Sequence, residues 1–381
     1  MIYLDNNATT PIESSVAAVM ERFIGEEFGN PSSSHRLGKV AKEAVQDARR
    51  SVAELVGAAS EAEIYFTSSG TESDNWAILG AIGSSNKPEH FITTAVEHEA
   101  VRKTFDRLER SGHEVTRLSV NEEGHLDLDE LRRSLRSNTF LVSVMMANNE
   151  TGVMFPIKEV SEMIHSESSA VFHVDAVNAA GKVPIDVYEM GVDLLSISAH
   201  KFQGPKGSGA LFVREGIQIE PFLVGGGQER GMRAGTEAVH QIVGLGAAAE
   251  IAKDMEQMDR IRKLRDLLEN KLISMIPHAY VNGTQDSMKR LPNTTNISFR
   301  YANGEIILHL LDECGIFVST GSACNAYGNE PSPVLVAMNV PYSRAMGSIR
   351  FSLGRQNSLE DISRVLDVMP EIVKRARSLA K

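Results

Sequence analysis

The stretch Leu141-Val142-Ser143-Val144-Met145-Met146 decides the fold class. It is apolar throughout except for one small serine, and it shows no alternation of polar and apolar positions. A strand with one face in water alternates in this way, whereas a strand covered on both faces is almost continuously apolar. The stretch therefore predicts a strand in a parallel sheet that helices cover on both sides.

The neighbouring sequence repeats this kind of strand in alternation with helical patterns. Strand-like runs occupy residues 63–66, 90–95, 114–120, 139–147, 170–176, 194–198 and 209–214. Helical patterns lie between the earlier runs, at residues 73–82, 99–111, 127–135 and 157–165. Regular alternation of strands and helices is typical of βαβ units, which build a mostly parallel sheet.

The pattern changes after about residue 238. A long helical pattern runs from there to about residue 276, and short strands and helices follow it. A last helix is expected from Leu359 to about residue 380, with Ser358 as its N-cap and Asp361 three residues further on. We therefore predict an α/β protein with a large domain at residues 12–255. A smaller α+β domain would combine residues 1–11 with 256–381.

Composition excludes several classes of protein. The 381 residues carry a net charge of -11, which argues against direct nucleic-acid binding. We find no apolar run near the roughly 18 residues that span a membrane, and no signal-peptide pattern at the start. Two cysteines cannot form a disulfide framework, so a reducing compartment is expected. A soluble, cytoplasmic protein of enzyme size is predicted.

Three predicted strand ends carry residues that can bind a ligand or take part in a reaction. Residues 67–72 (Thr-Ser-Ser-Gly-Thr-Glu) open a helix, where free N–H groups can bind a phosphate, although a simple capped helix start fits equally well. Asp175 ends one strand and Lys201 follows another, and each alone also fits a structural cap or a snorkelling surface lysine. Together, an anion cradle, an aspartate and a lysine are what a protein contributes to pyridoxal-phosphate chemistry.

At this point a family resemblance becomes visible. The chain resembles the pyridoxal-phosphate-dependent cysteine desulfurases of NifS/IscS type, in the class V aminotransferase superfamily. The matching stretches are residues 3–10, 28–33, 67–75, 97–98, 148–152, 173–176, 198–207, 225–231, 233–236, 321–324 and 348–352. The resemblance implies the fold type I architecture of pyridoxal-phosphate-dependent transferases, and release of L-alanine and sulfur from L-cysteine.

The resemblance assigns roles to particular residues. It gives cofactor contacts to Gly70, Thr71, His98, Asn149, Asp175, Asn178, Ser198, His200, Lys201 and Thr236. Lys201 would form the Schiff base with the cofactor and later take the Cα proton, and Asp175 would pair with the pyridine nitrogen. Thr236 resembles a phosphate contact donated by the other subunit, which implies a homodimer. The family usually has glutamine where Asn178 stands, so this contact to the cofactor's ring hydroxyl would be looser or bridged by water.

Further roles concern catalysis and the substrate. His98 would stack on the cofactor ring and move protons, although a hydrogen-bonded core histidine is an equally good interpretation. Arg350 would grip the substrate carboxylate beside Asn149, because a guanidinium binds carboxylates bidentately; a surface ion pair is the simpler alternative. The histidines and cysteines show no metal-ligand spacing, so no metal is expected.

The two cysteines are expected to differ. Cys314 ends an apolar helical pattern and is predicted to be a small core residue. Cys324 lies among small and polar residues and matches the family's persulfide-forming nucleophile. A protein acceptor, such as a scaffold for iron–sulfur cluster assembly, would then take the sulfur. Alternatives are a selenocysteine lyase, an aminotransferase, a desulfurase serving tRNA or DNA modification, or a non-catalytic scaffold.

Overall fold

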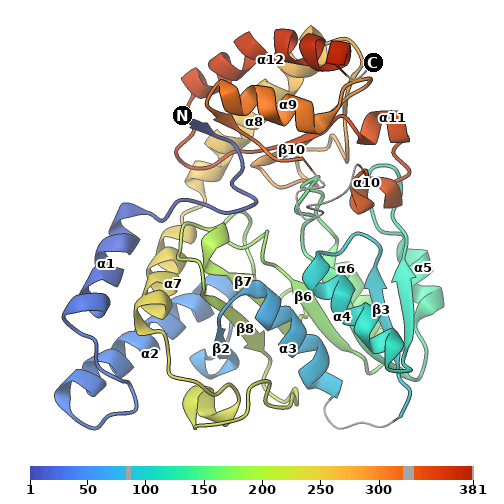
Figure 1. The fold of residues 1–381 in the computed structure, drawn as a ribbon. Helices are drawn as coiled ribbons and strands as arrows, with labels where there is room; N and C mark the ends of the chain where they lie inside the picture. Colours follow the sequence, from blue (N-terminus) through green and yellow to red (C-terminus); the bar gives the residue numbers. More distant parts are fainter. Residues whose placement is uncertain (83–86, 321–329, 380–381) are drawn as a thin grey trace.

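The computed structural model describes residues 1–82, 87–320 and 330–379. Figure 1 shows a large layered part built around the main sheet, with a smaller part above it that contains both chain termini. The N-terminal segment and the connection from α7 (Val239–Ala252) to α8 (Glu256–Met275) link the two parts. Among the described residues, no helix is long and apolar enough to cross a bilayer.

The main sheet has seven strands in the order β2-β8-β7-β6-β5-β3-β4. Their bounds are β2 (Ile64–Thr67), β3 (His90–Thr94), β4 (Glu114–Leu118), β5 (Thr139–Met145), β6 (Val171–Asp175), β7 (Leu194–Ser198) and β8 (Gly209–Val213). Of these, β8 alone runs antiparallel to its neighbours. All seven strands predicted from the sequence are present, with ends displaced by a residue or two.

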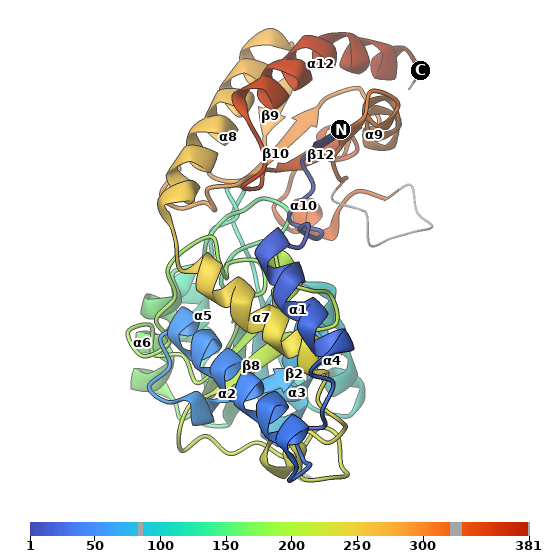
Figure 2. The same cartoon turned by 90° about the vertical axis from the view of Figure 1, so that its left-hand side faces the viewer.

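Helices cover both faces of this sheet, as the apolar run in β5 predicts. One face carries α1 (Ser14–Gly25), α2 (Arg36–Val56), α5 (Leu128–Ser134), α6 (Ile157–Glu167) and α7, and the other carries α3 (Gly70–Ile82) and α4 (Glu99–Arg110) (Figure 2). Leu141 belongs to the buried cluster under α3 and α4, and its neighbour Val142 belongs to the cluster on the opposite face. Since adjacent side chains of a strand point to opposite faces, both positions must be apolar.

The smaller part is built on the antiparallel sheet β12-β10-β9. Its elements are β9 (Ala279–Val281), β10 (Thr294–Phe299), β12 (Ser348–Ser352), α8, α9 (Gly304–Glu313), α10 (Pro333–Ala337), α11 (Tyr342–Ala345) and α12 (Leu359–Leu379). A short parallel pair joins β1 (Ile2–Tyr3) to β11 (Ile316–Phe317). The core of the smaller part contains Leu4 and residues from Met258 onward, whereas Leu291, Val334, Leu335 and Met338 belong to the core of the large part. The domain boundaries stay a prediction.

The cap of the last helix is confirmed. The Ser358 Oγ accepts from the Asp361 N–H at 3.2 Å, and the Asp361 Oδ2 accepts from the Ser358 N–H at 3.0 Å. These two bonds satisfy donors that the helix itself leaves open.

The prediction of one continuous helix from about residue 238 to about residue 276 was wrong. The helix α7 ends at Ala252 and α8 begins at Glu256. The Nη2 atom of Arg355 donates to the carbonyls of Ile251 at 3.0 Å and Asp254 at 2.8 Å. The Asp254 Oδ1 accepts from the Glu256 N–H at 3.0 Å, which gives the first N–H of α8 a partner. The break thus depends on an arginine about a hundred residues away in the sequence.

The prediction of a buried Cys314 was also wrong. Cys314 is exposed and lies at the C-cap of α9. The buried face of that helix consists of Gly304, Ile307, Leu310 and Leu311. Because the helix ends at Glu313, the next residue leaves this face instead of continuing it.

Candidate active site

The carboxyl ends of the parallel strands meet at one edge of the main sheet and form a cavity of about 480 Å³. This volume lies within the usual range for small-molecule sites. Residues of the smaller part, such as Ser319 and Arg350, close its other side. Ten of the twelve predicted site residues line the cavity: Gly70, Thr71, His98, Asn149, Asp175, Asn178, Ser198, His200, Lys201 and Arg350.

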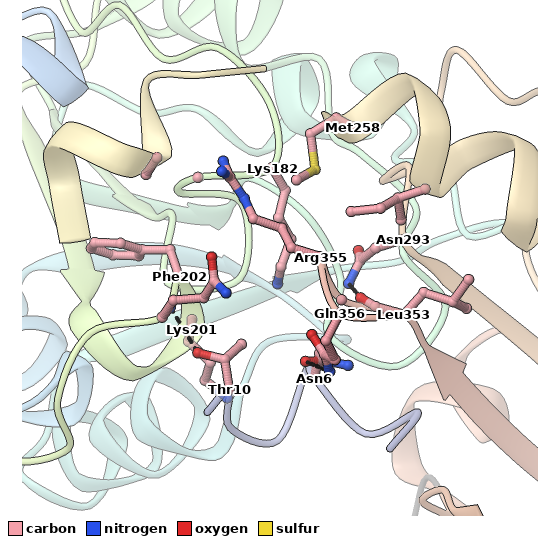
Figure 3. Close-up of a pocket in the computed structure, with 15 residues that line it drawn as sticks. Asn6, Thr10, Lys182, Lys201, Phe202, Met258, Asn293, Leu353, Arg355 and Gln356 are labelled. Atoms are coloured by element: carbon pink, nitrogen blue, oxygen red, sulfur yellow. Dashed lines mark hydrogen bonds between the residues drawn. The ribbon is translucent and has the colours of Figure 1, made fainter. Parts of the chain in front are cut away.

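Lys201 lies at the end of a single 3-10 turn (Ala199–Lys201) that directly follows β7. Its Nζ donates to the carbonyl oxygens of Asn7 at 2.6 Å and Ala8 at 3.1 Å. Lys201 also borders a second cavity of about 40 Å³, which Lys182 and Arg355 line as well (Figure 3). The lysine therefore stands between two cavities, with its amine held by the N-terminal segment.

Asp175 ends β6 and is 5% exposed. Its Oδ1 accepts from the Val177 N–H at 2.9 Å. Burial raises the pKa of Asp175, while the neighbouring His98 and Lys201 act in the opposite direction. A buried carboxyl of this kind favours a cationic partner such as a protonated ring nitrogen.

His98 caps α4, where its Nδ1 accepts from the Ala100 N–H at 3.2 Å. This bond leaves Nε2 as the ring atom that carries the proton in the neutral imidazole. Burial lowers the pKa of His98, and Asp175 partly offsets this effect. A neutral ring that lines the cavity can stack on a flat ligand and exchange a proton at Nε2.

Two further buried carboxyls, Asp74 and Glu97, also line the cavity. Burial raises the pKa of Asp74 well above its ordinary value, and Asp175 raises it further. Burial raises the pKa of Glu97 to about 8. Burial therefore favours the protonated form of both groups beside Asp175.

The helix α3 offers an anion cradle at its first turn. A Cβ built on Gly70 would lie 2.5 Å from the Val177 Cγ2 and 3.5 Å from the Ser198 Cβ, so only glycine leaves this space open. The first N–H groups of a helix have no partner within it, and they carry its positive dipole end. His200 lies beside the cradle, and burial lowers its pKa to about 4, so its ring is neutral at pH 7.

Asn178 is 6% exposed and lines the cavity. Its Nδ2 has no hydrogen-bond partner among the described residues, although it is fully buried. Its Oδ1 accepts from the Nζ of Lys182 at 2.9 Å. An unsatisfied buried donor is costly unless a ligand supplies the acceptor.

Arg350 lies on β12 with 6% of its surface exposed. Its Nη2 donates to the Asp5 Oδ1 at 2.6 Å, and its Nη1 donates to the Asn149 carbonyl at 3.0 Å. Its buried Nε finds no acceptor in the part of the chain that the structure describes. A guanidinium already held against one carboxylate is well placed to receive another.

The remaining two predicted site residues are Thr236 and Cys324. Thr236 is exposed and does not line the cavity. Cys324 lies outside the described residues.

Sequence reasoning assigned no role to several cavity residues. Asp5 and Asn7 lie in the N-terminal motif, and Asn7 is 1% exposed, with its side chain bonded to Thr294 and Lys182. Lys182 lies four residues after Asn178, and this helical spacing was the available signal. The contacts of Asn7 join residues far apart in the sequence, so no local pattern could reveal them.

The residues present fit pyridoxal 5′-phosphate. The open turn at Gly70 suits its phosphate, the buried carboxyl of Asp175 suits its ring nitrogen, and the unpartnered Nδ2 of Asn178 suits its ring hydroxyl oxygen. Lys201 supplies the amine to which such an aldehyde attaches.

Comparison with known proteins extends over the whole chain. The family model "Aminotransferase class-V" matches residues 2–365. The chain is 50% identical to cysteine desulfurase IscS of Methanosarcina thermophila, covering 100% of this chain and 93% of the relative. It is 51% identical to a cysteine desulfurase of Nostoc sp., covering 100% and 94%.

Solved structures agree with these relatives. A NifS-like protein superposes with a TM-score of 0.92 at 37% identity, covering 98% of this chain and 99% of that one. A structure of SspA in complex with cysteine has a TM-score of 0.83 at 34% identity, covering 94% and 100%.

The chain therefore belongs to the class-V aminotransferase family, whose cysteine desulfurases depend on pyridoxal phosphate. Within the family it groups with the cysteine desulfurases of IscS and NifS type, and it is an enzyme of that class. This confirms the family, the fold class and the activity predicted from the sequence.

Proposed function

We propose that this enzyme holds pyridoxal phosphate on Lys201 and uses it to remove sulfur from L-cysteine. The observation that carries the proposal is the convergence of ten predicted residues on one cavity. Bound there, the cofactor supplies a ring that withdraws electrons from the substrate's α-carbon. Gly70, Thr71, Ser198 and His200 would hold the phosphate.

The ring would be held by three side chains. Asp175 would bind the pyridine nitrogen, His98 would stack on the ring, and Asn178 would donate to the ring hydroxyl oxygen. Burial favours the protonated forms of Asp74 and Glu97, which supports this arrangement because protonated neighbours add no negative charge beside Asp175.

Substrate recognition would fall to Arg350. The L-cysteine carboxylate would accept from the Arg350 guanidinium, next to the Asn149 carbonyl that already orients it. Asp5 holds the guanidinium through its Nη2 before substrate arrives, and the buried Nε has no hydrogen-bond partner among the described residues. Lys201 Nζ, released from the cofactor by the substrate amine, would then take the Cα proton.

Cys324 would receive the sulfur. Its thiolate attacks the substrate sulfur, an S–S bond forms, and the C–S bond breaks with its electron pair left on carbon. That carbon is protonated, and the product leaves as L-alanine. The enzyme is left with a persulfide, which a protein acceptor takes up for iron–sulfur cluster assembly.

The quaternary structure is part of the proposal. Thr236 is exposed, and its loop is anchored to α3 by an ion pair from the Arg233 Nε to the Glu72 Oε1 at 2.8 Å. We propose a homodimer in which Thr236 completes the phosphate site of the other subunit. We also propose a cytoplasmic location, with a cofactor domain at residues 12–255 and a nucleophile-bearing domain formed by the rest.

The test is a product assay on the purified enzyme. With a thiol reductant present to release sulfide from the persulfide, L-cysteine should yield alanine and sulfide in equal amounts, with no amino transfer to a keto acid. Lys201→Ala should lose both the visible cofactor band and turnover. Cys324→Ala should keep the band and form no persulfide; wild-type release of alanine and sulfide by this variant would refute the assignment of the nucleophile.

The same enzyme discriminates the remaining alternatives. Faster turnover of L-selenocysteine than of L-cysteine would indicate a selenocysteine lyase. Acceptors that co-purify with the Cys324 persulfide state would separate cluster assembly from tRNA or DNA modification.

A further inference from the structure

Lys182 is a buried lysine that the proposed reaction does not use. It is 6% exposed and lies on the turn that follows β6. Its Nζ donates to the Asn178 backbone carbonyl at 2.8 Å, to the Asn178 Oδ1 at 2.9 Å and to the Asn7 Oδ1 at 3.2 Å. All three acceptors are neutral, and no ion pair to Lys182 is found among the described residues.

The backbone fixes Lys182 in this place. The N–H of Lys182 donates to the Ala179 carbonyl at 3.0 Å, and the N–H of Ala180 donates to the Ala176 carbonyl at 2.9 Å. Gly181 has φ +73°, and a Cβ there would lie 2.6 Å from the Phe202 Cβ, so the turn needs glycine. The lysine side chain is therefore delivered to Asn178 by a rigid turn.

The contact decides which way the Asn178 amide faces. A lysine amine or ammonium donates hydrogen bonds, so it selects the Oδ1 of the amide and not the Nδ2. The Nδ2 is thereby turned away from Lys182, and it is the buried donor left without a partner among the described residues. With the opposite orientation, Asn178 would offer an acceptor to the cavity and leave Lys182 facing a donor.

We propose that Lys182 is a positioning residue that locks the Asn178 carboxamide with its Nδ2 toward the cofactor's ring oxygen. This role also suits asparagine at position 178, because the short Asn178 side chain lies within reach of the Lys182 Nζ in the same turn. Burial, together with the positive charges of Lys201 and Arg350, lowers the pKa of Lys182 well below its ordinary value. The same bond network reaches Lys201 through Asn7, whose carbonyl accepts from the Lys201 Nζ at 2.6 Å.

The inference rests on the proposed cofactor site and is tested by cofactor binding, not by turnover. Trp76 is the only tryptophan of the chain, and it lies on α3, the helix of the phosphate cradle. Its fluorescence can follow the titration of cofactor-free enzyme with pyridoxal 5′-phosphate. Lys182→Met removes the donor but keeps the length, and we expect its dissociation constant to rise about tenfold.

A double-mutant cycle separates positioning from general damage. Asn178→Ala should weaken binding by a similar factor, and adding Lys182→Met to it should have no further effect. In Lys182→Met the pH midpoint of the visible cofactor band should also shift upward by about 0.5–1 unit, because the ring oxygen loses its donor. Arg355→Met is the matched control: Arg355 lines the same small cavity as Lys182 (Figure 3), but it donates to the Ile251 and Asp254 carbonyls, so the variant should leave affinity and midpoint unchanged.

Two outcomes would overturn the inference. Lys182→Met could bind the cofactor as tightly as the wild type, or it could weaken binding equally with and without the Asn178 side chain. If Lys182→Met does not fold, Lys182→Gln keeps an N–H donor and should bind within about threefold of the wild type; a loss as large as that of Asn178→Ala refutes the role. If the proposed cofactor site itself were wrong, the result would be different, because the fluorescence of the wild-type enzyme would then not respond to pyridoxal 5′-phosphate.

Discussion

The buried ion pair of Arg49 and Glu229 allows one prediction to be worked out in detail. The guanidinium and carboxylate meet at 2.7 and 2.8 Å in a bidentate pair, with side chains 4% and 3% exposed. Glu229 also accepts from the Phe66 N–H at 2.9 Å, and Arg49 donates to the Ile64 carbonyl at 2.8 Å. The pair thus ties β2 and α2 to the segment that leads to Thr236.

We expect Arg49→Met to reduce the free energy of unfolding by about 3–5 kcal/mol, because it leaves the Glu229 carboxylate buried without a counter-charge. Glu229→Gln should have a similar effect through the stranded Arg49. The double variant removes both charges, and its carboxamide oxygen can still accept from the Phe66 N–H. Its loss should therefore be only about 1–2 kcal/mol.

The assay is urea unfolding of the four proteins, followed by fluorescence at one pH. Lys374→Met is the control, because its ion pair with Glu371 is 78% and 75% exposed and should contribute under about 0.5 kcal/mol. Sedimentation of Arg49→Met should also show a weakening of the proposed homodimer. If the two single losses simply add in the double variant, or if Arg49→Met costs under about 1 kcal/mol, the pair is not the buried anchor described here.

Three further predictions concern the cavity. Burial raises the pKa of Glu97 to about 8, so its contribution to stability is complete below about pH 4.5 and is lost as pH rises toward 8. Glu97→Gln should reduce this loss of stability when urea midpoints are compared at pH 5.5 and 8.5, and an unchanged pH dependence would contradict the prediction. Gly70→Ala places a methyl group 2.5 Å from the Val177 side chain, and it should weaken pyridoxal-phosphate binding about tenfold or more in a fluorescence titration; wild-type affinity would show that the cradle is not the phosphate site. Arg350→Lys cannot bind bidentately, so its KM for L-cysteine should rise about tenfold or more while the cofactor band is kept, and an unchanged KM would move the substrate carboxylate elsewhere.

The fold and much of the site were predictable because their signals are local. The apolar run of β5 indicates that both faces of this strand are covered. Asp175 ends β6 and Lys201 lies in the turn after β7, and the ends of these two strands lie at the same edge of the sheet. Whether such residues meet at one edge depends only on the direction of their strands. The alternation of strands and helices predicts that these strands are parallel.

Contacts between distant segments could not be predicted in this way. The bond from the Lys182 Nζ to the Asn7 Oδ1 and the ion pair of Arg350 with Asp5 join residues 175 and 345 positions apart. The break between α7 and α8 likewise depends on Arg355, which no pattern near residue 253 reveals. The exposure of Cys314 follows from where α9 stops, and helix ends are less strongly encoded than helix faces.

The N-terminal segment has a consequence for amide exchange. The Asn6 N–H donates to the Ser352 carbonyl at 3.1 Å, and the Asn7 N–H donates to the Ser352 Oγ at 2.9 Å. The Asn7 carbonyl holds Lys201 at the same time. These two amides can exchange with deuterium only when the segment lifts from β12, and that opening also separates the Asn7 carbonyl from Lys201. Their exchange rates therefore report, without any substrate, how often the N-terminal segment separates from β12.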